Sequence, residues 1–375
     1  MTRKKGGAAK GGAPGERGQP GKRSPTLKQL AQHLGLAPAT VSTVMNGGVS
    51  SGIAADTQQR IREAARELGY RPNFLARCLR TRKSYTIGVI IPEVSQGYNV
   101  LVLKGIEDFL VGTDYFYFVA SHHNKPALVE DYAYKFLDRA ADALVVVSAD
   151  WRLQLDVPVA TVSSHQTAKG ATRIELDHDH AAELGLRHLM DLGHRRIAFI
   201  QGPAHIPDSA VRWRAITAAA GRLGLPLSDR LVAPILDDTP SCPKLGYDVT
   251  RRLLAGGAPF TALWAFNDVT AVGAINALQE SGRRVPHDVS VLGFDDIEAT
   301  SFQGPGLSTI RQPLEEMGKL AAQAVLAALA GARPPAAEIV VRPELVVRET
   351  TIAPADAAPS RRRPAREARR VEPPG

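Results

Sequence analysis

Residues 26–46, TLKQLAQHLGLAPATVSTVMN, contain two short helical patterns separated by Gly35 and decide the fold of the N-terminal part of the chain. Thr26 and Gln29 form the capping-box pair that begins a helix. The apolar residues of the first helix recur at the spacing of a packed face: Leu27, Leu30, Ala31 and Leu34. Gly35 can adopt the left-handed conformation that ends this helix. The stretch therefore predicts a helix-turn-helix.

The second helix is expected to bury Val41, Val44 and Met45 against the first. Its other face carries small side chains: Ala39, Thr40, Ser42 and Thr43. A helix held against a small core in this way fits the major groove of DNA. The same pattern also arises where two amphipathic helices pack inside a globular core, so the motif alone leaves both interpretations open.

A third helix is predicted from Asp56, which is its expected cap, and Gly69 closes it. One face of this helix is apolar: Ile61, Ala64, Ala65 and Leu68. Three short helices with facing apolar sides can share one small core.

Positive charge is concentrated in the same part of the chain. Residues 1–85 contain sixteen Lys and Arg against four Asp and Glu, a net charge of +12. The whole chain carries +8, so the remainder carries −4. The basic charge therefore lies where a polyanion such as DNA would bind.

Residues 26–83 resemble the DNA-binding headpiece of the lac-repressor family, through ATVSTVMN at residue 39 and ELGYRPNFLARCLR at residue 67. Further blocks resemble the family in the family's order: IGVIIP at 87, HLMDLGHRRIAFIQGP at 188, ALWAFNDVTAVGAINAL at 262, VPHDVSVLGFDDI at 285 and LSTIRQPLEEMGKLAAQAV at 307. Several blocks in a fixed order are more specific than one helix-turn-helix. The resemblance spans all but the two ends of the chain.

Beyond residue 85, apolar runs typical of strands alternate with helical stretches, which indicates an α/β fold with parallel sheets. The resemblance implies an all-α helix-turn-helix headpiece followed by a bilobed core like that of periplasmic sugar-binding proteins, with two parallel-sheet subdomains. It also implies that the chain crosses between the subdomains near 163–173 and 295–310. Ligands of open α/β sheets bind beyond the carboxyl ends of the strands, here in the cleft between the lobes.

Five parts are predicted along the chain: a disordered basic tail (1–24), a DNA-binding domain (25–72), a hinge helix or linker (73–85), an effector-binding and dimerisation core (86–352) and a disordered tail (353–375). The favoured interpretation of the basic tails is that their charge keeps the protein soluble. The alternative is that they attract DNA without sequence specificity. No signal peptide and no long apolar run occurs, so a cytoplasmic, nucleoid-associated protein without a membrane role is expected. Two cysteines, Cys78 and Cys242, fit a reducing compartment.

The resemblance implies base contacts by Pro38, Ala39 and Thr43. It places Thr26, Thr40, Ser42 and Asn46 nearer the phosphates. Thr43 departs from the family, in which most members carry an arginine that can contact guanine through two hydrogen bonds. The usual half-site contact is therefore in doubt.

The segment from Asn73 to Arg80 resembles the family's hinge helix, which folds when two subunits bind the operator together. Ala76 belongs to this segment, and Leu79 is the residue that would enter the minor groove and kink the duplex. The alternative is a plain interdomain linker in which Leu79 only packs. The double-stranded operator is expected to be an inverted repeat bound by a homodimer.

Three cleft residues match the family's effector contacts: Arg212, Asn267 and Asp295. A guanidinium, an amide and a carboxylate suit the vicinal hydroxyls of a carbohydrate. Each residue could instead be structural, with Asn267 capping a helix and Asp295 pairing with a nearby base. Ser163 and Tyr98 are further candidates, although the sequence around both departs from sugar-responsive relatives.

Aromatic rings that could stack on a ligand are Tyr98, Trp151 and Trp264, of which Trp264 lies in a strand and suits the core. GVSSG at 48–52 matches a nucleophile elbow but follows a helix rather than a strand, so no enzyme is predicted. DHDH at 177–180 suggests a metal site, yet its position before a helix favours capping, and no metal or cofactor is predicted. A small-molecule-controlled repressor is the favoured function. A sugar-binding protein or carbohydrate-processing enzyme without a DNA role is the alternative.

Overall fold

The computed structural model describes residues 25–45, 52–70, 78, 83–95, 97–166, 169–236, 242–301, 304–332 and 337–355. The chain divides into two compact units, Met1–Arg82 and Lys83–Gly375. Within the described residues, no helix is both long and apolar enough to span a membrane. The predicted N-terminal tail, all but the first three residues of the predicted C-terminal tail and most of the predicted hinge, including Asn73, Ala76 and Leu79, lie outside these residues, as does Asn46.

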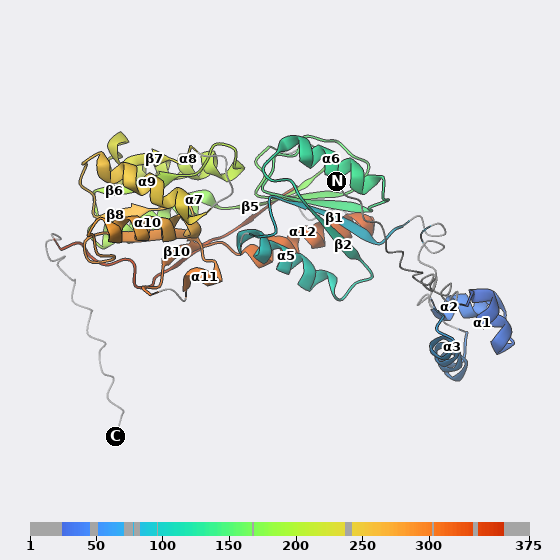
Figure 1. The fold of residues 1–375 in the computed structure, drawn as a ribbon. Coiled ribbons are helices and arrows are strands. Elements are labelled where there is room, and N and C mark those ends of the chain that lie inside the picture. Colours follow the sequence, from blue (N-terminus) through green and yellow to red (C-terminus); the bar gives the residue numbers. More distant parts are fainter. Residues whose placement is uncertain are drawn as a thin grey trace, which may run out of the picture. The chain divides into compact units, whose positions relative to one another are not determined.

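The described residues of the N-terminal unit include the helices α1 (Leu27–Leu34), α2 (Pro38–Met45) and α3 (Ala55–Glu67) (Figure 1). The predicted capping box is present, since Thr26 N donates to Gln29 Oε1 at 2.8 Å and Gln29 N donates to Thr26 Oγ1 at 3.3 Å. Gly35 ends α1 at a φ of 66°. One small core joins the helices: Leu30, Ala31, Val41, Val44, Ile61, Ala64 and Ala65. The helix-turn-helix prediction is confirmed.

Two details of α3 differ from expectation. Its N-cap is Ala54, whose side chain has no atom that can accept a hydrogen bond, and Asp56 lies two positions beyond it, within the helix. Asp56 instead places a negative charge in the first turn, near the positive end of the helix dipole. Leu68, predicted on the apolar face, is the C-cap residue and is 38% exposed.

The first lobe of the larger unit is built on a six-stranded, fully parallel sheet in the order β11-β5-β4-β3-β1-β2. Its strands are β1 (Thr86–Ile91), β2 (Phe116–Ser121), β3 (Ala143–Val147), β4 (Val159–Val162), β5 (Thr172–Leu176) and β11 (Glu338–Val341). Its helices are α5 (Gly97–Leu110), α6 (Pro126–Leu137) and α12 (Leu314–Leu329).

Alternation along β1 shows why helices cover both faces of this sheet. Ile87, Val89 and Ile91 pack in one cluster with α5 and α12, whereas Ile90 packs in another with α6. A strand buried on both faces reads as a continuous apolar run, which is how IGVII appears in the sequence.

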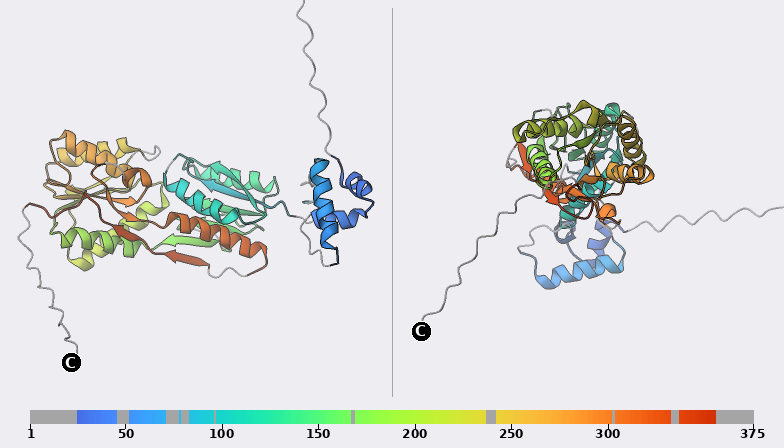
Figure 2. Two further views of the ribbon diagram at one scale, coloured as in Figure 1. Left: turned by 90° about the horizontal axis from the view of Figure 1, so that it is seen from below. Right: turned by 90° about the vertical axis from the view of Figure 1, so that its left-hand side faces the viewer.

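The second lobe repeats this architecture with the order β12-β10-β9-β8-β6-β7, in which only β10 and β12 are antiparallel. Its strands are β6 (Ile197–Gln201), β7 (Val232–Pro234), β8 (Ala262–Trp264), β9 (Ser290–Asp295), β10 (Ser308–Arg311) and β12 (Glu344–Val346). Its helices are α7 (His178–Asp191), α8 (Pro207–Leu223), η1 (Asp229–Leu231), α9 (Pro243–Ala255), α10 (Asp268–Glu280) and α11 (Glu298–Ser301). The left-hand view in Figure 2 shows one sheet in each lobe, with helices packed against it.

Among the described strands, the chain crosses between lobes at three places. The first crossing follows β5 at 176–178, and the second follows β10 at 311–314. Both lie just after the predicted ranges, because β5 still pairs with β4 in the first sheet and β10 still pairs with β9 in the second. The third crossing joins β11 to β12 at 341–344 and was not predicted. Three adjacent crossings form the hinge of the core.

The packing of α5 on α12 depends on two glycines. A Cβ atom at Gly105 would lie 1.8 Å from the carbonyl oxygen of Glu315, and one at Gly318 would lie 2.0 Å from that of Val102. The helix backbones can approach this closely only because neither position has a side chain.

We therefore expect Gly105→Ala to destabilise the core by about 1–3 kcal/mol or more, since helix backbone rather than a flexible side chain must move. Gly221→Ala in α8 is the matched control, because its Cβ meets open space, and it should add about 0.5–1 kcal/mol of stability. Urea unfolding followed by circular dichroism measures both. Equal stability of the two variants would contradict the close helix packing.

Candidate functional site

The outer face of α2 carries the small side chains predicted to meet DNA. Pro38 and Ala39 are exposed, whereas Thr40, Ser42 and Thr43 are half-buried. The Thr43 hydroxyl donates to the carbonyl of Ala39 at 3.0 Å. Its hydrogen is therefore used within the helix, which leaves a methyl group and oxygen lone pairs facing outward. Thr26, at the start of α1, is exposed.

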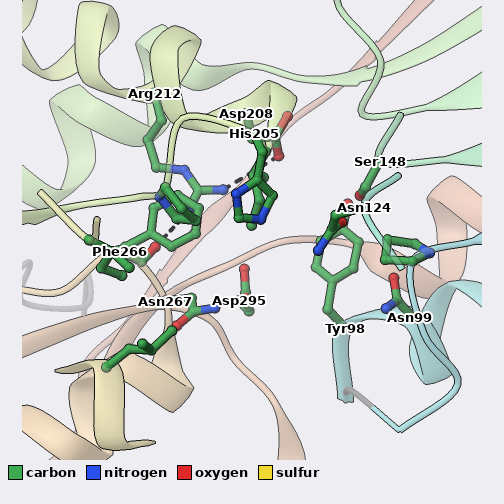
Figure 3. A pocket seen from close by; sticks show the side chains of 15 residues that line it. Tyr98, Asn99, Asn124, Ser148, His205, Asp208, Arg212, Phe266, Asn267 and Asp295 are labelled. Carbon is green, nitrogen blue, oxygen red and sulfur yellow. Dashed lines mark hydrogen bonds and ion pairs between the residues drawn. The ribbon is translucent and has the colours of Figure 1, made fainter. Parts of the chain in front are cut away.

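A cavity lies between the two lobes of the core and encloses about 710 Å³ of empty space, its open mouth included. Figure 3 shows residues of the first lobe facing residues of the second across it. The polar side chains that line it are Tyr98, Asn99, Asn124 and Ser148 from the first lobe, and His205, Asp208, Arg212, Asn267 and Asp295 from the second.

Arg212, on α8, is the fixed cation of the cavity. Its side chain is buried, and its guanidinium lies 3.6 Å from the ring centroid of Phe294 and 4.7 Å from that of Phe266. Its Nη1 donates to the carbonyl of Phe266 at 2.6 Å, and its Nη2 lies 3.5 Å from Asp208 Oδ2. Packing, hydrogen bonding and charge together hold the guanidinium in one orientation.

Asn267 lines the cavity and is also the N-cap of α10. Its Oδ1 accepts hydrogen bonds from Thr270 N at 2.9 Å and from Thr270 Oγ1 at 2.6 Å. The structural role considered for this residue is therefore confirmed. Because these hydrogen bonds hold the Oδ1 atom, they also fix the orientation of the Asn267 amide at the cavity wall.

Asp295 ends β9 at the bottom of the cavity, with a φ of 117°. The alternative role considered for Asp295 was pairing with a nearby basic side chain. In the structure its neighbour Asp296 forms such pairs, with Arg311 and Arg348 at 2.7 Å each. Gln312 Nε2 donates to Asp295 Oδ1 at 2.7 Å. Burial raises the pKa of Asp295 to about 8, against the opposing charge of Arg212. A carboxyl that is protonated near neutral pH can donate a hydrogen bond as well as accept one.

Tyr98 lines the cavity, and its hydroxyl lies 2.8 Å from Ser163 Oγ. Ser163 is itself buried and does not line the cavity, so it contacts the Tyr98 hydroxyl from the protein interior. The other two candidate rings, Trp151 and Trp264, are buried in hydrophobic clusters instead. Both rings are covered by neighbouring side chains, and neither lines the cavity between the lobes.

Beside the cavity lies a cluster of three polar side chains, His165, His178 and Asp208, that the sequence did not predict. Asp177 caps α7 by accepting from His180 N at 2.9 Å, which confirms the capping role predicted for the DHDH run. His178 in the same run turns toward Asp208. The i, i+4 spacing of Asp208 and Arg212 on one helix was a signal that could have identified Asp208.

Comparison with known proteins shows two family matches. Residues 26–73 match the bacterial regulatory proteins of the lacI family, and residues 186–351 match the periplasmic binding protein-like domain.

Similar curated proteins include the HTH-type transcriptional repressor PurR of Photorhabdus laumondii, 28% identical over 336 residues that cover 87% of this chain and 97% of that protein. The ribose operon repressor of Haemophilus influenzae is 27% identical over 331 residues, covering 87% of this chain and 98% of that repressor.

A solved structure of the lac repressor dimer, bound to operator and the anti-inducer ONPF, has a TM-score of 0.78 at 25% identity. The match covers 88% of this chain and all of that one.

The raised pKa of Asp295 predicts a specific pH dependence of stability. An aspartate in the unfolded chain has a pKa of about 3.9, whereas the folded group keeps its proton to about pH 8. The folded state therefore binds the extra proton between these values, and stability falls as pH rises through this window.

We expect the free energy of unfolding of the unmodified protein to fall relative to that of Asp295→Asn between about pH 4 and pH 8. The neutral amide resembles the protonated acid but cannot lose a proton. Urea titrations at several pH values measure the difference. A constant difference across the window would show that Asp295 is ionised in the folded protein.

Proposed function

Because the chain belongs to the lacI family of bacterial regulatory proteins, we propose that it is a transcriptional repressor whose affinity for operator DNA is controlled by a small molecule bound between its lobes. The observation that carries this proposal is the presence, in one chain, of a helix-turn-helix unit and a two-lobed core with a cavity lined by residues of both lobes. The same headpiece disfavours a sugar-binding protein without a DNA role. The cavity is proposed to bind a ligand rather than transform it.

Control by the ligand follows from residues on both sides of the cavity. A ligand that contacts Tyr98 of the first lobe together with Arg212 and Asp295 of the second favours one lobe arrangement over another. The segment 73–85 joins the two compact units and includes Ala76 and Leu79. We propose that this segment couples lobe closure to operator binding.

A carbohydrate is the ligand class that the cavity favours. Arg212 donates, the amide nitrogen of Asn267 donates, and a protonated Asp295 both donates and accepts, so hydroxyl groups find partners of either kind. One relative is named a ribose operon repressor, and one structural neighbour is a transcriptional regulator in complex with cellobiose. Ribose and cellobiose appear in the names of those proteins, and we choose them as the first compounds to test on this chain.

The proposed repressor acts as a homodimer in the cytoplasm, bound to an inverted-repeat operator on the chromosome. Strand β2 lies at the edge of the first sheet and exposes Phe116, Phe118 and Val119. An exposed apolar edge strand is a surface that a second copy can cover. The solved lac repressor structure named above is a dimer on operator DNA.

Specificity at Thr43 is a first test. Its hydroxyl is bonded to Ala39 and it cannot form the paired contact of an arginine, so the operator should show weak preference at one base pair in each half-site. Thr43→Arg should sharpen selection there by about 1–3 kcal/mol. Selection of sites from random DNA, run on both proteins, measures this. Identical motifs, or motifs without dyad symmetry, would contradict the proposed docking.

The effector cavity is a second test. Thermal unfolding with a panel that contains ribose and cellobiose should identify a sugar that raises Tm. Asp295→Asn and Arg212→Lys should lose that shift and the matching change in operator affinity, because the ligand loses a fixed donor or acceptor. Arg214→Lys, exposed on the same helix, is the control and should respond normally. A normal response of both cavity variants would remove these residues from the site.

A further inference from the structure

Four titratable side chains meet at the first crossing between the lobes. His165 follows β4 and Glu175 lies on β5 in the first lobe, whereas His178 begins α7 and Asp208 lies in the first turn of α8 in the second. His165 Nε2 lies 2.7 Å from Asp208 Oδ1, and His178 Nε2 lies 3.5 Å from the same oxygen. We call His165, His178 and Asp208 the hinge triad.

His178 is the unexplained member of the triad. Its side chain is 4% exposed, and neither ring nitrogen forms a hydrogen bond of normal geometry with the residues that the structure describes. Burying a polar group without a partner costs free energy. The ring stacks on Phe294, with centroids 6.5 Å apart, so a phenylalanine would pack there without that cost. A bound ion that accepts the Nε2 lone pair would explain the choice of histidine.

The donor atoms of the triad fit a transition-metal ion. One donor atom from each of its residues lies within 4.8 Å of the others. Two imidazole nitrogens with one carboxylate oxygen are a zinc ligand set, and two ligands about 2 Å from a tetrahedral zinc lie roughly 3.3 Å apart.

Glu175 supplies the outer contact that metal-bound histidines commonly have. Its Oε2 lies 3.1 Å from Nδ1 of His165, and its Oε1 accepts from Ser164 N at 3.2 Å. A carboxylate on Nδ1 directs the Nε2 lone pair of His165 toward Asp208 and His178. A second cavity, lined by His165, Glu175 and His178 among others, reaches the group from outside and provides an entry path.

We propose that His165, His178 and Asp208 bind one Zn²⁺ ion that links the two lobes at their hinge. The fourth coordination position is left for water or a ligand atom. Asp208 also lines the effector cavity and lies 3.5 Å from Arg212, so the ion would change the charge that the effector meets. That consequence for regulation rests on the proposed function, whereas the metal site does not.

Isothermal titration of the full chain with zinc chloride, after removal of metals by a chelator, tests the site directly. One ion per chain is expected. His178→Phe should lose this binding, while Glu175→Gln should weaken it by roughly 10- to 100-fold, the cost of losing an outer contact. His180→Phe, two residues along the same helix, is the matched control and should bind as the unmodified protein does.

His165→Gln, at a partly exposed position, supplies a second ligand variant if His178→Phe does not fold. Zinc should raise Tm of the unmodified chain and of His180→Phe but not of the ligand variants. No stoichiometric binding, or equal binding by all variants, would overturn the site. Since neither measurement involves DNA, failure of operator binding would overturn the proposed function and leave this site standing.

Discussion

The buried guanidinium of Arg212 is the constraint on which the centre of this protein depends. A charge removed from water must be compensated where it lies, or the group destabilises the fold. Here the compensation comes from the Phe266 carbonyl, the rings of Phe266 and Phe294, and the Asp208 carboxylate. These groups lie on α8, on β9 and in the loop between β8 and α10 in the second lobe. The cation therefore organises the wall of the cavity before any ligand arrives.

Arg212 also explains how two nearby acids can differ. Asp208 lies beside two histidines and the guanidinium, and its pKa is lowered in spite of burial. Asp295 receives an amide hydrogen bond from Gln312, and burial raises its pKa. One wall of the cavity thus combines a permanent anion with an acid that is protonated near neutral pH. A ligand with both hydroxyl donors and acceptors can use the two together.

The sequence predicted features whose signal is local and missed those that depend on contacts between distant segments. The capping box of Thr26 and Gln29, the turn at Gly35 and the buried strand from residue 87 each follow from a few adjacent residues. Family resemblance placed Tyr98, Arg212, Asn267 and Asp295 in the cleft, and the structure brings all four to one cavity. The predicted effector and DNA contacts themselves stay predictions.

The hinge triad shows why the remainder could not be predicted. His165, His178 and Asp208 come from a loop and two helix starts, and nothing in their spacing indicates that they meet. The DHDH run offered two interpretations of one segment, capping or metal binding. In the structure Asp177 takes the capping role, while His178 turns toward Asp208 and is the residue proposed to bind the ion. A local pattern can therefore support two functions at once when a helix start lies at a domain crossing.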